Sequence, residues 1–162
     1  MRQGPAAQLW LVIVDASAST QRHGALRDAK GVLAALFDSA YRARARLALL
    51  NASGASPRWA RQGLKASAAL QGWLAALGGG GGTPLAEALA LAGPWLARRR
   101  AACPEEQVRC LVITDGRVRE LEAQPLGCAT WLLDIERGAL RLGRGRVLAQ
   151  QLGAQYLHID GV

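Results

Sequence analysis

The sequence has few of the residues from which most catalytic and metal centres are built. Its two histidines, His23 and His158, are far apart in the chain, and its three cysteines form no C-x-x-C pair. The patterns of a zinc site and of a disulfide framework are therefore absent, and no cysteine has an evident activating partner. Cys110 and Cys128 each begin an apolar run and are expected to be small buried hydrophobes, and His158 is expected on a sheet face. No catalytic site is evident in this chain alone.

Long apolar segments are also missing. No run approaches the roughly 18 residues that a membrane-spanning helix needs, and the residues after Met1 resemble neither a signal peptide nor a transit helix. A cytoplasmic location is therefore the expectation. The 162 residues, of which 51% are hydrophobic, suffice for one folded domain and predict a single domain over 1–162.

Nucleotide-binding motifs are absent as well. The glycine run Gly78–Gly82 is followed by Thr83 and Pro84, where a phosphate-binding loop requires a lysine. No G-x-G-x-x-G turn follows the first apolar run. A phosphate-transferring aspartate would be followed by a second carboxylate two residues later, but Asp15 is followed there by Ser17. The sequence encodes no ATP site.

Basic residues are abundant, and the net charge is +8. Arginines cluster at Tyr41–Arg46, Ala97–Arg100 and Arg141–Arg146. These clusters lack interleaved aromatic residues, and the chain has no helix-turn-helix or other nucleic-acid motif. The pattern favours solvated helix ends or an acidic protein partner over nucleic acid.

Short apolar runs alternate with longer segments of helical spacing. Strands are predicted at Gln8–Val14, Arg46–Asn51, Gln107–Gly116, Cys128–Glu136 and Gln155–Asp160, with a short edge strand at Ser56–Gln62. Helices are predicted at Gly24–Arg42, Leu64–Leu77, Pro84–Arg100 and Gly145–Ala154. Pro94 is expected to kink or restart the third of them. The alternation predicts an α/β fold, a Rossmann-like doubly wound and mainly parallel sheet flanked by helices.

Oxygen-bearing side chains gather where two predicted strands end. Asp15 and Asp115 each follow a buried strand, Ser17 and Ser19 alternate after Asp15, and Thr83 follows the glycine run. Ligands of open parallel sheets bind beyond the carboxyl ends of the strands. Carboxylate and hydroxyl oxygens suit magnesium, calcium or manganese better than zinc or copper. Taken alone, the segment after Asp15 is also typical of a strand end followed by a helix N-cap, but the other two loops favour a metal site.

Two further features of the sequence lead to predictions. Asp134 and Glu136 lie at the same sheet edge and could support the site, although solvation or capping is the expected role. Trp10 and Trp131 belong to strands and are expected in the core, whereas Trp59 has polar neighbours and is expected to be exposed.

Three segments in this order resemble a known family. "DASAS" (Asp15–Ser19), "GGTPL" (Gly81–Leu85) and "TDG" (Thr114–Gly116) resemble the metal-ion-dependent adhesion site, or MIDAS, of von Willebrand factor A (vWA) domains. The resemblance implies a vWA fold and a bound Mg²⁺, with Mn²⁺ or Ca²⁺ as alternatives, completed by an acidic side chain of a partner protein. The implied metal ligands are Asp15, Ser17, Ser19, Thr83 and Asp115.

A closer resemblance comes from "LGGGGGTPLAEALALA", "LVITDGR" and "RVLAQQLGAQYLHID". These segments are similar to the vWA domain of the D subunit of magnesium and cobalt chelatases. That resemblance implies a non-catalytic component of an ATP-dependent chelatase in tetrapyrrole or cobalamin biosynthesis, with an AAA+ ATPase subunit and the large chelatase subunit as partners. The AAA+-like region and linker typical of that subunit are absent, so we expect a fragment or a stand-alone small subunit. Ala18 replaces a common glycine that is not a ligand, and "TDGRVRE" lacks a frequent asparagine.

Two alternatives remain open at this stage. One is a vWA partner-docking module of another AAA+ or adhesion system. The other is a metal-dependent phosphate-ester hydrolase at the same sheet edge, for which the sequence supplies neither a general base nor a second metal site. The arginines Arg98–Arg100 are a hypothetical contact with the ATPase ring, based on charge alone.

Overall fold

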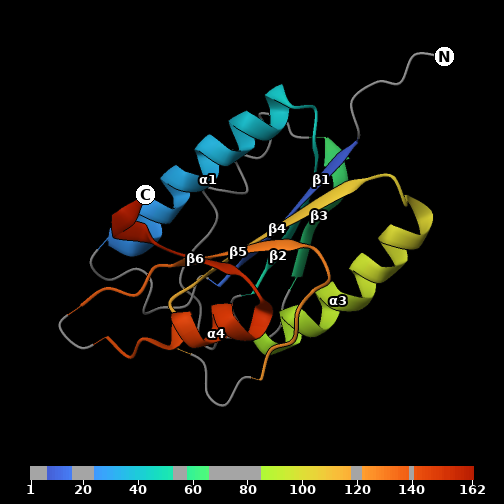
Figure 1. Ribbon diagram of the computed structural model, residues 1–162. Coiled ribbons are helices and arrows are strands. Elements are labelled where there is room, and N and C mark those ends of the chain that lie inside the picture. Colours follow the sequence, from blue (N-terminus) through green and yellow to red (C-terminus); the bar gives the residue numbers. More distant parts are fainter. Residues whose placement is uncertain (1–6, 16–23, 53–57, 66–84, 118–121, 139–140) are drawn as a thin grey trace.

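The apolar runs of the sequence form a six-stranded sheet with the order β3-β2-β1-β4-β5-β6 (Figure 1). The computed structural model describes residues 7–15, 24–52, 58–65, 85–117, 122–138 and 141–162. The strands are β1 (Gln8–Val14), β2 (Arg46–Asn51), β3 (Arg58–Lys65), β4 (Gln107–Thr114), β5 (Ala129–Asp134) and β6 (Gln155–His158). Five strands are parallel and β3 is antiparallel to β2. The predicted α/β fold with a mainly parallel sheet is confirmed.

Helices cover both faces of this sheet. Helix α1 (Ala25–Arg42) lies on one face, and α3 (Leu85–Ala102) and α4 (Arg144–Leu152) lie on the other (Figure 1). A short 3-10 helix, η2 (Ile159–Gly161), follows β6 and contacts α1. No helix in these described ranges is both long and apolar enough to cross a membrane.

The central strand β1 supplies the core on both faces, because successive side chains of a strand point to opposite sides. Leu11 and Ile13 pack with α3 and α4, whereas Val12 and Val14 pack with α1. All four side chains are fully buried. This explains why the strand reads as a continuous apolar run in the sequence.

Several predicted boundaries need correction. The edge strand begins at Arg58 and continues through Leu64 and Lys65, which were predicted to open a helix. Leu64 pairs with Leu47 and Lys65 with Arg46, so antiparallel pairing with β2 overrides the local helical spacing. The remainder of that predicted helix, 66–77, lies outside the described residues. The last strand is also shorter than predicted, because η2 begins at Ile159.

Pro94 does not restart α3, which is continuous from Leu85 to Ala102. A proline inside a helix leaves the carbonyl four residues earlier without its backbone donor. That carbonyl belongs to Ala90, and both Ala90 and Pro94 lie on the exposed side of the helix. Water can therefore satisfy the carbonyl, and the helix continues.

Burial of the tryptophans and cysteines was predicted only in part. Trp10 and Trp131 are not core residues: both are half-buried, and their indole N–H groups donate to Gln8 and Gln155, respectively, at 3.0 Å. Cys110 is buried as predicted, and burial raises the pKa of its thiol well above the usual value. Cys128 is only half-buried, which corrects its prediction. The side chain of Trp59 lies outside the described part of the chain.

Part of the arginine cluster at the end of α3 is structural. Arg99 donates two hydrogen bonds to the carboxylate of Glu106, at 2.7 and 2.8 Å. Arg100 donates to the carbonyl of Leu126 at 3.3 Å. These two residues brace the segments that precede β4 and β5. Of the predicted contact Arg98–Arg100, the exposed Arg98 is therefore the residue best placed for an external partner.

An ion-pair network ties the C-terminal segment to the start of α1. Arg137 donates to Asp28 at 2.6 Å and to Asp160 at 2.7 and 3.0 Å. Hydrogen bonding to Arg137 is the main reason why the pKa values of the Asp28 and Asp160 carboxyl groups are lowered. The network joins segments that are far apart in the sequence.

This network predicts a loss of stability in acid. Both carboxyl pKa values are lower in the folded protein than in the unfolded chain, where they lie near 3.8. The ion pairs therefore stabilise the fold fully above that unfolded value, and the contribution is lost as the pH falls through the folded values. The midpoint of urea unfolding should fall between about pH 5 and pH 3, and less steeply in Arg137→Gln. An Arg98→Gln control should follow the wild type, and an equal slope in Arg137→Gln would contradict the assignment.

Candidate functional site

Buried acidic residues mark the ends of three adjacent strands. Asp15 follows β1, Asp115 follows β4, and Asp134 and Glu136 lie at the end of β5. Each is at most 3% exposed. Buried carboxylates are expensive unless they are hydrogen-bonded, paired or bound to a metal, so their gathering at one sheet edge identifies the candidate site.

The carboxylate of Asp15 is held by Thr114 of the neighbouring strand. The backbone N–H of Asp15 donates to the carbonyl of Ile113 at 2.8 Å, so the β1–β4 ladder continues to this residue. The hydroxyl of Thr114 donates to Asp15 Oδ2 at 2.7 Å and accepts from the N–H of Gly116 at 3.0 Å. This chain of hydrogen bonds fixes the direction of the threonine proton and holds Asp15 Oδ2 as its acceptor.

The Asp115 turn is fixed by its own hydrogen bond and by a close approach to α4. Asp115 Oδ1 accepts from the backbone N–H of Arg117 at 3.0 Å. Gly116 adopts a φ of +71°, and a Cβ at this position would lie 2.7 Å from the backbone nitrogen of Gly145. Only glycine combines that φ with that space, so α4 locks the turn that carries Asp115.

Asp134 and Glu136 support the start of α4. The backbone N–H of Gly143, which precedes the first turn, donates to Glu136 Oε1 at 3.0 Å. Asp134 accepts from the N–H of Glu136 at 2.9 Å and from the hydroxyl of Tyr156 at 2.6 Å. Burial and the Asp134 carboxylate raise the pKa of Tyr156 to about 12, so the phenol remains a donor. The expected capping role agrees with the contact of Glu136, whereas the expected solvation is wrong because both acids are buried.

Glu136 also faces a guanidinium. Arg117 Nε lies 3.4 Å from Glu136 Oε2, and the arginine side chain is 40% exposed. The negative charge at the sheet edge is thus partly balanced beside the Asp115 turn.

Two of the five predicted metal ligands can be placed. Asp15 and Asp115 follow paired strands at the predicted edge, whereas Ser17, Ser19 and Thr83 lie outside the described residues. Within the ranges that the structure describes, no group of three or more histidine, cysteine, aspartate or glutamate side chains is arranged as a metal site. The two carboxylates nevertheless fit the hard-oxygen chemistry of magnesium. Sequence reasoning missed the role of Thr114, although it directly precedes Asp115 in the "TDG" motif.

The solved structures that resemble this chain share its fold at low sequence identity. The VWA domain of SpRpn10 matches with a TM-score of 0.66 and 11% identity, over 95% of this chain and 88% of that one. An aerotolerance-related membrane protein from Bacteroides fragilis matches with a TM-score of 0.63 and 15% identity, over 94% of this chain and 90% of that one. At such identities the similarity concerns the fold alone.

Curated relatives match nearly all of this chain. The magnesium-chelatase 67 kDa subunit of Chlorobaculum tepidum is 30% identical over 177 aligned positions, which cover 93% of this chain and 28% of that subunit. An uncharacterized protein of Mycobacterium tuberculosis is 27% identical, over 99% of this chain and 27% of its own length. The chain thus spans little more than a quarter of the curated relatives that it matches. No family model matches the sequence.

Proposed function

We propose that this chain, which has the von Willebrand factor A fold, is a metal-dependent protein-interaction domain of a chelatase complex. The observation that carries the proposal is the Asp15–Thr114 hydrogen bond of 2.7 Å beside Asp115. It joins the first and third segments of the predicted MIDAS at the carboxyl edge of the sheet. In such sheets, ligands bind beside the strand from which successive connections leave in opposite directions. Here that strand is β1, which has a parallel neighbour on each side.

The proposed ligands of the ion are Asp15, Ser17, Ser19, Thr83 and Asp115. A bound Mg²⁺, with Mn²⁺ or Ca²⁺ as alternatives, would supply positive charge and a coordination position for a carboxylate of the partner. In this chain, Thr114 orients Asp15, and Gly116 together with α4 holds the turn of Asp115. The side chains of Asp15 and Asp115 are thus held in place by the fold itself, which would lower the ordering cost of binding.

The proposed complex is an ATP-dependent magnesium or cobalt chelatase of tetrapyrrole or cobalamin biosynthesis, located in the cytoplasm. The similarity to the Chlorobaculum tepidum magnesium-chelatase subunit supports this context. The proposed partners are the AAA+ ATPase subunit and the large chelatase subunit, either of which could donate the acidic side chain. The chain itself would be non-catalytic, and docking within another AAA+ system is the alternative.

Phosphate-ester hydrolysis at the same edge has less support. A hydrolase needs a general base within reach of the metal-bound water. In the described part of the chain, the nearest histidine candidate is His158, whose Nε2 contacts the carbonyl of Glu136 at 2.8 Å and whose Nδ1 accepts from the N–H of Asp160 at 3.1 Å. Both ring nitrogens are engaged by the backbone, which makes His158 a structural residue.

The test is the affinity of the chain for the chelatase ATPase subunit of the same organism. Biolayer interferometry in Mg²⁺ should give a dissociation constant at least about tenfold lower than in EDTA, a difference of roughly 1.4 kcal/mol. An Asp115→Ala variant should lose the difference, and Arg98→Ala should keep it. Equal binding in EDTA would contradict metal-dependent docking, and metal-dependent release of p-nitrophenol from its phosphate ester would favour the hydrolase.

A further inference from the structure

Arg146, in the first turn of α4, is an exposed residue whose guanidinium is held in a defined place. The guanidinium carbon lies over the ring of Tyr156, 4.4 Å from the ring centroid. The hydroxyl of Tyr156 donates to Asp134 at 2.6 Å, and this buried carboxylate also accepts from the backbone N–H of Glu136. Helix α4 lies beside β5 and β6, which contain Asp134 and Tyr156 (Figure 1). The guanidinium is thus tied through Tyr156 to a carboxylate of the candidate site.

The start of α4 approaches the candidate site most closely at Gly145. A Cβ at Gly145 would lie 2.5 Å from Asp134 Oδ2, and a Cβ at Gly116 would lie 2.7 Å from the backbone nitrogen of Gly145. Gly145 therefore faces the Asp115 turn and the end of β5. Successive helix residues are about 100° apart around the axis. Arg146 consequently lies on a flank of α4 beside the candidate site, on the side of β6.

The hydrogen-bond donors of Arg146 are available to an anionic ligand. Among the described residues, Arg146 forms no ion pair, whereas Arg141 and Arg117 each lie 3.4 Å from a carboxylate, those of Asp160 and Glu136, respectively. Stacking on an aromatic ring uses the flat face of a guanidinium and leaves its in-plane N–H groups free to donate. Such a group can bind a carboxylate through two parallel hydrogen bonds.

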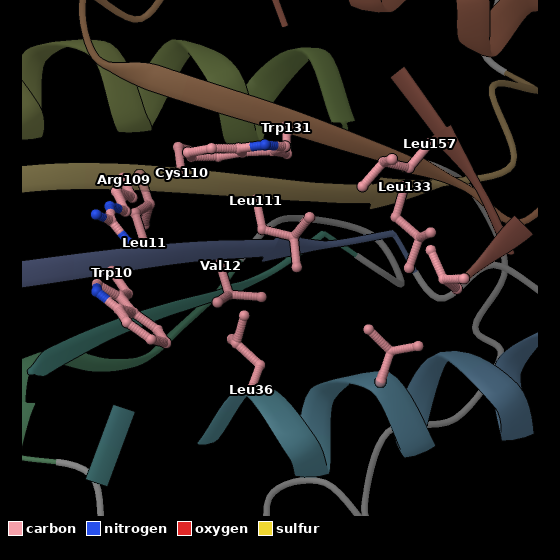
Figure 2. A pocket seen from close by; sticks show the side chains of 12 residues that line it. Trp10, Leu11, Val12, Leu36, Arg109, Cys110, Leu111, Trp131, Leu133 and Leu157 are labelled. Carbon is pink, nitrogen blue, oxygen red and sulfur yellow. The ribbon is translucent and has the colours of Figure 1, made fainter. Parts of the chain in front are cut away.

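Arg109, on the other face of the sheet, has a different environment. It is the one charged residue among the side chains of Figure 2, and its neighbours there are almost all apolar. Apolar neighbours do not orient a guanidinium by hydrogen bonds, whereas the aromatic ring under Arg146 is itself fixed by a buried carboxylate. A side chain that is ordered before binding loses less conformational entropy on binding. Arg146 is therefore the better placed of the two for recognition.

We propose that Arg146 binds a second acidic side chain of the partner that docks at the metal site. This inference rests on the proposed function, in which a first acidic side chain of that partner completes the coordination of the ion. The net charge of +8 favours an acidic partner. The second carboxylate would accept hydrogen bonds from the guanidinium of Arg146 at the flank of α4, outside the coordination sphere of the ion.

The strand order specifies how far apart the two acidic residues of the partner should be. The proposed metal site lies at the ends of β1 and β4, whereas Tyr156, under Arg146, belongs to β6, two strands beyond β4. Neighbouring strands are about 4.8 Å apart, so the two docking points are separated by about 10–14 Å. An extended segment advances about 3.3 Å per residue. The two acidic residues should therefore stand three or four positions apart in an extended segment of the partner.

The test uses synthetic Gly-Ser peptides that carry either one Asp or two Asp at separations of one to six positions. Their affinities for the whole chain are measured by NMR titration in Mg²⁺ and in EDTA. In Mg²⁺, a separation of three or four should tighten binding about fivefold over the single-Asp peptide, the upper end for an exposed ion pair. Arg146→Gln should lose this gain, and the matched control Arg98→Gln, also at an exposed arginine, should keep it.

A charge exchange tests the same contact in the opposite direction. Arg146→Glu should bind a peptide with Lys in the second position better than the peptide with two Asp, and Arg98→Glu should not. Arg146→Lys keeps the charge but loses the planar set of donors, so it should retain only part of the gain. Circular dichroism checks that each variant is folded.

The outcomes separate this inference from the proposed function. If the single-Asp peptide binds only in Mg²⁺ but a second Asp adds nothing at any separation, the metal site stands and the inference is overturned. The inference is also overturned if Arg146→Gln keeps the preference for a separation of three or four. If the single-Asp peptide binds equally well in EDTA, the proposed metal-dependent docking is wrong, and the inference fails with it.

Discussion

Replacing Asp15 by asparagine should abolish the stabilisation of this protein by Mg²⁺ and leave the metal-free fold intact. Asparagine has nearly the size of aspartate, and its side-chain oxygen can still accept the hydrogen bond from Thr114, which is 2.7 Å long in the wild type. The substitution therefore removes the negative charge and replaces one carboxylate oxygen by an NH2 group. Since Asp15 is fully buried, loss of that charge also removes a desolvation cost, and the metal-free variant should melt at or above the wild-type temperature.

The expected effect follows from the linkage between binding and folding. A ligand at 100 times its dissociation constant stabilises the folded state by about 2.7 kcal/mol. In a chain of this length, 1 kcal/mol shifts the melting temperature by about 2–4 °C. Saturating Mg²⁺ should thus raise the melting temperature of the wild type by roughly 5–11 °C over EDTA, and that of Asp15→Asn by about zero. Scanning calorimetry in both buffers measures the difference.

Asp28→Asn is the matched control, because it makes the same chemical change at a carboxylate paired with Arg137. This control should keep the full response to Mg²⁺. If the wild type itself shows no response, the proposed metal site is wrong and Asp15 is simply a strand-end residue held by Thr114. If Asp15→Asn responds like the wild type, magnesium binds without this ligand.

The local sequence pattern predicted the bounds of some strands and not those of others. The observed bounds of β1 and β2 agree with the predicted ranges to the residue. The extent of β3 could not be predicted, since Leu64 and Lys65 are held by pairing with β2. Trp10 and Trp131 were assigned to the core because they lie in central strands. Their partial exposure depends on which helices cover that face of the sheet, and the local sequence pattern does not show which helices these are.

The features of the candidate site were likewise predicted only in part. The position of Asp15 and Asp115 at one edge of the sheet was predicted from motif and topology, and both are buried at the ends of paired strands. Their role as metal ligands stays a prediction. The burial of Asp134 and Glu136 was not predicted, because it depends on the position of the start of α4 in the folded protein. Ser17, Ser19 and Thr83 remain predictions.

Replacing Gly116 by alanine should cause a large loss of stability. Two costs combine at this position. Its φ is +71°, and a left-handed conformation costs a residue with a Cβ roughly 1–2 kcal/mol. The new Cβ would also lie 2.7 Å from the backbone nitrogen of Gly145, and such overpacking typically costs about 1–3 kcal/mol. The free energy of unfolding should fall by about 2–5 kcal/mol.

Gly143→Ala separates the two costs. Gly143 has nearly the same φ, +70°, but no atom lies within 4 Å of its added Cβ, so this variant should lose only the conformational part, about 1–2 kcal/mol. Urea unfolding of both variants at 25 °C measures the difference, and equal losses would show that the contact with α4 contributes nothing. Because Gly116 directly follows Asp115, relief of the clash must move either the turn or α4. We therefore expect Gly116→Ala to weaken Mg²⁺ binding as well, and Gly143→Ala to preserve it, which would tie the packing of α4 to the proposed metal site.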